Sequence, residues 1–206
     1  MGSMVSYGLY QSSAYRLPPL EGEISLPCLE NKGSIKYDKW GIPHIYASSR
    51  KDAYRLQGFV TAQHRCFQLT MAWLALNGKL CSVIGAAAKP VDVFARTCNF
   101  KGLGEADWEW LFERRAKYQK AIDAVSCYAQ GINAWLSHPR FYVPVELSRV
   151  ILNYSPQFWS AADVMAMGRY LGIKMSPGWS TKMMATLMIQ IVGRENAKWF
   201  CYVQNM

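Results

Sequence analysis

Three histidines are the side chains best suited to acid–base chemistry near neutral pH, because imidazole exchanges its proton in that range. His44 stands between Pro43 and Ile45, where a hydrogen-bonded core residue is favoured over a general base. His64 lies at the rim of an apolar helical face, which favours a solvated or ion-paired side chain. His138, in LSHPR, is interpreted as a loop residue. Sequence neighbours mark none of the three as catalytic.

The familiar sequence patterns of catalytic and phosphate-binding sites are absent from the chain. It contains no GxSxG serine motif, no P-loop, no GxGxxG loop and no HExxH zinc motif. Asp92 and Arg96 stand four residues apart, but such helical pairs are usually structural and contribute about 0.3 kcal/mol. The residues alone therefore indicate a soluble α+β domain and no particular reaction.

The six cysteines are scattered, without a CxxC pair or a Cys/His ligand spacing. They are Cys28, Cys66, Cys81, Cys98, Cys127 and Cys201. This pattern argues against a structural zinc site. An even number would permit disulfides, but no compact secreted framework is visible. Small buried thiols are therefore the favoured interpretation.

The net charge of +9 suggests nucleic acid or an anionic membrane as a possible partner. The densest basic run, ERRAKYQK at 113–120, is typical of a solvated helix face, so no nucleic-acid partner is expected. The longest apolar run, MMATLMIQIV at 183–192, has ten residues, whereas a membrane span needs about 20. Residues 1–20 show no basic segment followed by an apolar one, so no secretory signal is recognised.

Hydrophobic patterning predicts short strands followed by a helical majority, which is an α+β fold, mostly α. Residues 1–20 are expected to form a flexible N-terminal segment. Strands are predicted at 23–30, 34–38 and 44–47, and helices at 51–80, 106–121, 122–137, 161–174 and 180–192. Gly58 lies inside the long helix, where glycine is costly, so close packing against another backbone is expected there.

Several stretches, taken in order, resemble the α-subunit of the penicillin amidase (penicillin acylase) family. They are SIKYDKWGIPHIYA, DAYRLQGFVTAQHRCFQLTMAWLALNGKL, YAQGINAWL, VPVEL, YSPQFWSAADVMAMGRYLG and MSPGWSTKM, between Gly33 and Phe200. The family consists of N-terminal nucleophile hydrolases with an αββα fold. The resemblance implies that residues 21–206 form an α-subunit-like domain, incomplete without a β-chain. It also implies amide substrates with an apolar acyl group.

The resemblance also assigns roles to particular residues. In the family, the terminal serine of the β-chain is the nucleophile and its own amine is the base. The structural motif residues of this chain are Gly41, Pro43, His44, Gln63, Arg65, Asn133 and Trp135. His44 is then expected to hold the turn that leads into the long helix. The acyl pocket falls at about Lys174, Met175, Ser176 and Trp179, and the alternative is that these are ordinary core residues.

The chain departs from the family pattern at its charged positions. His64 replaces an aspartate, Tyr37 an arginine, and Trp73-Leu74 a pair of arginines, which predicts repacking as apolar contact. Lys182 stands where the family has a calcium-ligating glutamate, so no calcium and no other cofactor are expected.

The only Gly-Ser pairs are Gly2-Ser3 and Gly33-Ser34, and neither resembles the junction that begins a β-chain. These 206 residues are therefore predicted to be inactive alone. The alternative is a non-catalytic remnant that acts as a binding module. The lack of a recognisable signal favours the cytoplasm, although bacterial relatives are commonly exported, so the location stays open.

Overall fold

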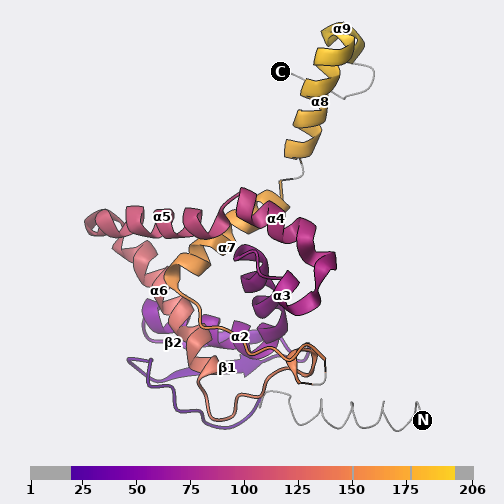
Figure 1. Ribbon diagram of the computed structural model, residues 1–206. Coiled ribbons are helices and arrows are strands. Elements are labelled where there is room, and N and C mark those ends of the chain that lie inside the picture. Colours follow the sequence, from indigo (N-terminus) through magenta and orange to yellow (C-terminus); the bar gives the residue numbers. More distant parts are fainter. Residues whose placement is uncertain (1–19, 150, 177, 198–206) are drawn as a thin grey trace, which may run out of the picture. The chain divides into compact units, whose positions relative to one another are not determined.

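A computed structural model describes residues 20–149, 151–176 and 178–197, with the side chains of 179 and 180 excepted. Helices form most of it (Figure 1). The elements are β1 Gly33–Tyr37, β2 Pro43–Ala47, α2 Arg50–Leu76, α3 Cys81–Ile84, η1 Ala86–Ala88, α4 Lys89–Thr97, α5 Phe100–Glu113, α6 Arg115–Leu136, η2 Val145–Leu147, α7 Ala161–Lys174, α8 Gly178–Val192 and α9 Arg194–Ala197. The predicted order of short strands followed by a helical majority is confirmed.

The two strands form an antiparallel hairpin with Ile35 opposite Ile45. Its turn contains Gly41 at φ +76°, a backbone conformation that glycine adopts without strain. The strand predicted at 23–30 is wrong, because these residues form no ladder and a turn joins the Leu29 N–H to the Leu26 carbonyl. Pro27 interrupts the run and has no N–H to offer a neighbouring strand.

Helix α2 begins after Ser49, whose hydroxyl accepts the N–H of Asp52 at 3.0 Å. It ends at Leu76, four residues earlier than the predicted Leu80, because Gly78 turns the chain at φ +58°. The guanidinium of Arg96, on α4, donates to the Gly78 carbonyl and holds this end.

Helices α2 and α6 pack backbone to backbone. A Cβ on Gly58 would collide with the carbonyl oxygen of Tyr128, and one on Gly131 would collide with that of Arg55. The close packing predicted at Gly58 is therefore confirmed. Around the contact lies the main core, formed by Phe59, Val60, Ala62, Ile132, Trp135 and Trp159.

The middle helices differ from their predicted bounds. The break expected at 121–122 falls at Arg114, between α5 and α6, where neither glycine nor proline signals it. Helices α3 and α4 were not predicted. The Asp92 carboxylate holds them together by accepting the N–H groups of Leu80 and Cys81, both at 2.8 Å.

Helix α7 has its predicted bounds. Ser160 and Asp163 cap its start reciprocally: the Ser160 N–H donates to the carboxylate and the Asp163 N–H to the hydroxyl. At Gly104 a Cβ would meet the Ala162 carbonyl oxygen, so α5 and the first turns of α7 also approach closely.

Contacts divide the chain into a unit up to Met167 and a second unit from Gly168 onward. Within the second unit, α8 begins two residues before its predicted start and packs on α9. No helix in the described ranges is long and apolar enough to cross a membrane. The expected flexible segment lies almost wholly outside the described residues, and a single domain over 21–206 stays a prediction.

Candidate functional site

His44 lies on the outward face of the hairpin. Its side chain is 52% exposed, so the expected core position is wrong, and its Nε2 lies 3.4 Å from the Asp38 carboxylate. That carboxylate also accepts the N–H groups of Ile42 and Trp40 across the turn, each at 2.9 Å. These N–H donors, with a smaller contribution from His44, lower the pKa of Asp38. The carboxylate of Asp38 therefore organises the turn, and His44 adds one contact to it.

Two departures from the family pattern contact each other. The Tyr37 hydroxyl lies 2.9 Å from His64 Nε2 and 3.3 Å from the Gln63 amide oxygen. The rings of Tyr37 and His64 meet edge to face, with centroids 5.4 Å apart. The purely apolar repacking expected here is wrong, because a hydroxyl–imidazole hydrogen bond links the two positions. Partial burial and the positive charge of Arg65 lower the pKa of His64.

The third departure is apolar, as expected. Leu74 is fully buried in a second core cluster with Ala75, Leu80 and Ala88, and Trp73 packs against it. The Lys79 ammonium lies 5.1 Å from the Trp73 ring centroid. The Trp73 indole N–H is buried without a hydrogen-bond partner among the described residues.

A buried ionic cluster ties the segment before β1 to α2. The Asp52 carboxylate, which is fully buried, accepts the N–H groups of Glu30 and Asn31 at 3.0 and 3.1 Å. It also pairs with the Arg55 guanidinium at 2.9 Å, and Arg55 reaches Glu30 and Gln130. Burial alone would raise the pKa of Asp52, but these donors outweigh it and lower the pKa to about 2.

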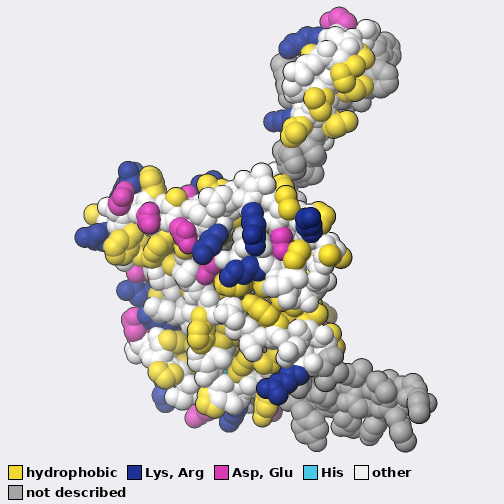
Figure 2. All heavy atoms as spheres, in the orientation of Figure 1, with side chains coloured by type: hydrophobic (Ala, Val, Ile, Leu, Met, Phe, Trp, Pro, Cys, Tyr) yellow, Lys and Arg dark blue, Asp and Glu magenta, His cyan; other side chains and the backbone are white. Residues whose placement is uncertain are grey.

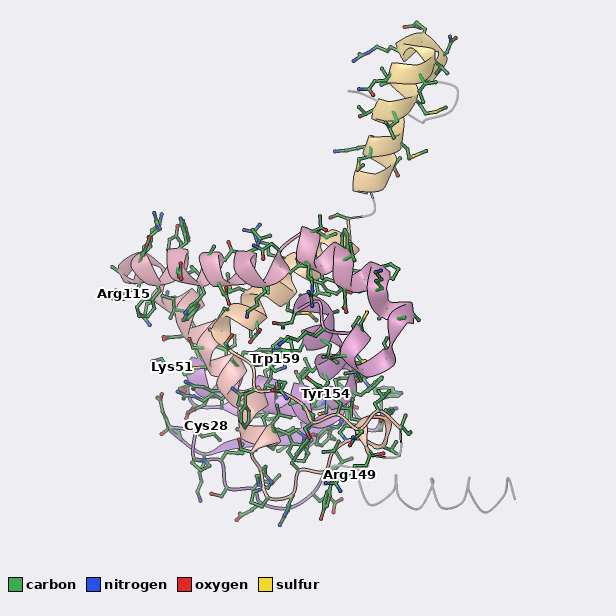
Figure 3. The ribbon with its side chains drawn as sticks, viewed as in Figure 1. Cys28, Lys51, Arg115, Arg149, Tyr154 and Trp159 are labelled. Carbon is green, nitrogen blue, oxygen red and sulfur yellow. The ribbon has the colours of Figure 1, made fainter. Side chains whose placement is uncertain are left out.

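The sequence patterns did not predict this cluster, although the helix start that contains Asp52 has a local sequence signal. Ser49 and Asp52 stand in an S-x-x-D pattern before an apolar helical run, which is a helix-start signal. The tertiary partners of Asp52 lie 21 and 22 residues before it, and no local pattern indicates them. Cys28, labelled in Figure 3, belongs to the segment that the cluster anchors.

Asn133 and Trp135 have structural positions on α6. The Asn133 amide donates to the Trp159 carbonyl and accepts the Trp159 N–H, both at 2.8 Å. Trp159 is labelled in Figure 3. This pair of hydrogen bonds anchors the segment that leads into α7. Trp135 is 3% exposed and meets Phe59 edge to face, and the His138 ring stacks on it.

Gln63 is buried on α2, whereas Arg65 is exposed at a kink where its φ and ψ are non-helical. Pro43 opens β2. The motif residues therefore lie in the hairpin, on α2 and on α6, and they do not converge on one site.

The first of the predicted acyl-pocket residues, Lys174, ends α7, and the others follow it. Met175 is 80% exposed and Ser176 is also exposed, so neither belongs to the core of the described chain. The Lys174 ammonium lies 5.5 Å from the Tyr170 ring centroid. The side chain of Trp179 lies outside the described residues. Lys182 is exposed on α8.

Candidate metal ligands are not clustered among the described residues. No group of three His, Cys, Asp or Glu side chains is placed to hold a metal ion within the described ranges. In the same ranges the imidazoles are hydrogen-bonded to a carboxylate, a phenol and a backbone N–H, and to no Ser, Thr or Cys side chain.

The described cysteines are unbridged. Cys66 and Cys127 are buried, and burial raises the pKa of Cys66 to about 11. Cys28, Cys81 and Cys98 are only partly buried, and Cys201 lies outside the described residues.

Comparisons with known proteins agree on one family. The family model described as penicillin amidase matches residues 32–204. Penicillin acylase 2 proenzyme of Pseudomonas sp. strain SE83 is 34% identical over 181 residues, which make up 88% of this chain and 22% of that protein. Acyl-homoserine lactone acylase QuiP of Pseudomonas fluorescens Pf-5 is 30% identical over 89% of this chain and 22% of that relative.

A solved structure shares the fold. Thermostable penicillin G acylase from Alcaligenes faecalis superposes with a TM-score of 0.59 at 19% identity, over 85% of this chain and 93% of that chain. The chain spans about a fifth of the length of the curated relatives it matches.

Proposed function

The chain belongs to the penicillin amidase family, and from this membership we propose that it is the α-subunit-like part of an acylase-type amidohydrolase. Such an enzyme adds water across a linear amide C–N bond, so that an acid and an amine leave. Its substrates are N-acyl compounds such as β-lactams with an acyl side chain or acyl homoserine lactones. The observation that carries the proposal is the family match over residues 32–204.

These residues alone do not hydrolyse amides. The described histidines are hydrogen-bonded to a carboxylate, a phenol and a backbone N–H, and to no Ser, Thr or Cys side chain. The nucleophile is instead a terminal serine whose own amine takes its proton, and it lies on a β-chain or on a continuation of this chain. The near-complete match to one solved acylase chain supports this division into two polypeptides.

The contribution of this chain to substrate binding is an apolar surface for the acyl group. Met175, Ser176 and Trp179 supply it, because a flexible thioether and a broad ring fill irregular apolar pockets. The 80% exposure of Met175 leaves its side chain available to a second polypeptide. No calcium binds at Lys182, since an ammonium group repels the ion.

A second candidate is a non-catalytic binding module built on the same fold. The Tyr37–His64 hydrogen bond favours it, because a neutral pair occupies positions where the family pattern has an arginine and an aspartate. The two candidates differ in what they require of the surface. A subunit part needs a partner over its apolar side chains, and a module does not.

The exposed apolar side chains favour the subunit part. Hydrophobic side chains reach the surface of both units (Figure 2). The most exposed of them are Trp40, Phe158, Met175 and Ile191. A partner chain would remove this surface from water.

The test is an amide-hydrolysis assay with penicillin G and a long-chain N-acyl homoserine lactone. Three samples are compared: the purified chain, the part of the strain SE83 acylase that this chain does not match, and their mixture. We expect product only in the mixture. We also expect the chain alone to bind a hydrophobic dye and to lose that binding when mixed. A monomeric chain that melts cooperatively, binds no dye and yields no activity in the mixture would favour the binding module.

A further inference from the structure

Strand β1 has an edge that no described strand covers. The Asp38 N–H donates to the Ile42 carbonyl at 3.1 Å, so Asp38 and Ile42 are a hydrogen-bonded pair. Bonded and non-bonded pairs alternate in an antiparallel ladder. With the observed register, Gly33, Ile35 and Tyr37 therefore direct their N–H and C=O groups away from β2.

The outer edge of β2 is less suited to pairing. Pro43 stands opposite Tyr37 in a non-bonded pair, so its nitrogen faces outward and carries no hydrogen. Proline at such a position blunts an edge against further strands. The outer edge of β2 therefore lacks an N–H donor at Pro43, whereas the outer edge of β1 keeps all its N–H and C=O groups.

A cavity of about 640 Å³ lies at the outer edge of β1. Gly33, Ile35 and Tyr37, whose backbone polar groups point away from β2, line it, and so do residues 20–26. Leu56 and Phe59 of α2 also line it. We name this cavity the β1 slot.

The segment that contains residues 20–26 is anchored on its C-terminal side. Ile24 and Leu26 pack against the main core. The buried Asp52 carboxylate fixes the N–H groups of Glu30 and Asn31. The β1 slot is therefore a space between two anchored segments.

We propose that an extended strand from the remaining part of the acylase enters the β1 slot and pairs with β1. This proposal rests on the proposed function. An added strand gains main-chain hydrogen bonds from the sheet edge and side-chain contacts at every second residue. The five residues of β1 span about 17 Å, which accommodates a strand of similar length.

The lining also indicates the chemistry of the strand. Leu56 and Phe59 favour apolar side chains at the inward positions. Glu21 and Glu23 line the slot together with one cation, Lys32, among the described residues, so basic side chains are favoured at the outer positions. Glu30 also lines it, but its carboxylate pairs with Arg55 at 3.0 Å. A second copy of this chain is disfavoured, because pairing β1 with β1 would bring two sets of these carboxylates together.

Amide hydrogen exchange of the full 206-residue chain tests the proposal directly. The probe partner is the part of the strain SE83 acylase that this chain does not match. On mixing, we expect the amides of Gly33, Ile35 and Tyr37 to exchange about 100-fold more slowly. The amides of Ser34 and Lys36 face β2 and serve as internal controls, already protected in both samples.

A matched pair of variants tests the slot without relying on exchange alone. Ser25→Trp places a ring in the slot, whereas Lys36→Trp places the same ring on the exposed hairpin face. We expect Ser25→Trp to weaken binding of the probe by about tenfold or more, and Lys36→Trp by less than about twofold.

The outcomes separate this proposal from the proposed function. Amide hydrolysis in the mixture with unchanged exchange at Ile35 overturns the strand and leaves the acylase standing. Protection of Ile35 already in the chain alone also overturns it. If this protection of Ile35 increases with protein concentration, a second copy of the chain occupies the slot. If it does not change with concentration, the chain's own N-terminal residues occupy it. Failure to associate, with no hydrolysis, overturns both.

Discussion

Replacing Asp52 by asparagine removes the charge on which the segment before β1 depends. The variant keeps the side-chain size, but it leaves the Arg55 guanidinium, which is 11% exposed, with the half-exposed Glu30 as its remaining carboxylate. Breaking a buried pair in this way costs about 3 to 5 kcal/mol, and the retained Glu30 and Gln130 contacts place the expected loss near the lower figure.

The same carboxylate predicts how stability depends on pH. Lowering the pKa of Asp52 from 3.8 to about 2 corresponds to about 2 kcal/mol of folding free energy. Because the folded-state pKa lies below the unfolded value, this stabilisation is complete above about pH 4. It is lost as the pH falls through 2. Asp52→Asn should therefore flatten the stability profile between pH 4 and 2.

Urea unfolding followed by circular dichroism at several pH values measures both effects. The matched control is Asp123→Asn, which removes a carboxylate 3.6 Å from Lys51 at the surface and should cost less than about 1 kcal/mol. The reasoning would be refuted if both variants lost the same free energy of unfolding. It would also be refuted if Asp52→Asn lost stability between pH 4 and 2 as steeply as the unmodified chain.

Three further predictions concern packing, the Tyr37–His64 contact and the thiols. Gly131→Ala forces a methyl group into the Arg55 carbonyl and should cost about 3 kcal/mol by urea unfolding. Gly168→Ala, with nothing within 4 Å, should be neutral or stabilising, and equal effects would contradict the packing account. Arg65→Ala should raise the pKa of His64 in an NMR titration, because a neighbouring cation disfavours imidazolium, while Gln68→Ala should leave it unchanged. Native-state alkylation followed by mass spectrometry should modify the half-buried Cys98 well before the buried Cys66, and the reverse order would rule out the burial assigned to Cys66.

Local patterns predicted the elements whose signals lie within their own sequence. Helix α7 has a Ser160/Asp163 capping pair at its start, and its predicted bounds are confirmed. Gly58 indicated a close helix contact, and the Tyr128 carbonyl provides it. The family resemblance, read from ordered blocks, indicated the fold and the family.

The incorrect predictions arise from contacts between residues that lie far apart in the sequence. Residues 23–30 have a strand-like composition, but the N–H groups of Glu30 and Asn31 bind the Asp52 carboxylate instead of a neighbouring strand. The break at Arg114 has no local signal. The Tyr37–His64 bond joins residues 27 apart, and the loss of charge relative to the family pattern had suggested apolar contact there. The acyl-pocket residues stay a prediction, since their role depends on a second polypeptide.

The most direct test of the central claim is a titration of amide hydrolysis. A fixed amount of the unmatched part of the strain SE83 acylase is mixed with increasing amounts of this chain, and release of the amine from penicillin G is followed. The account predicts no release by either polypeptide alone and a rate that saturates at one chain per partner. Hydrolysis by the chain alone, or no hydrolysis at any ratio despite stable association, would contradict it.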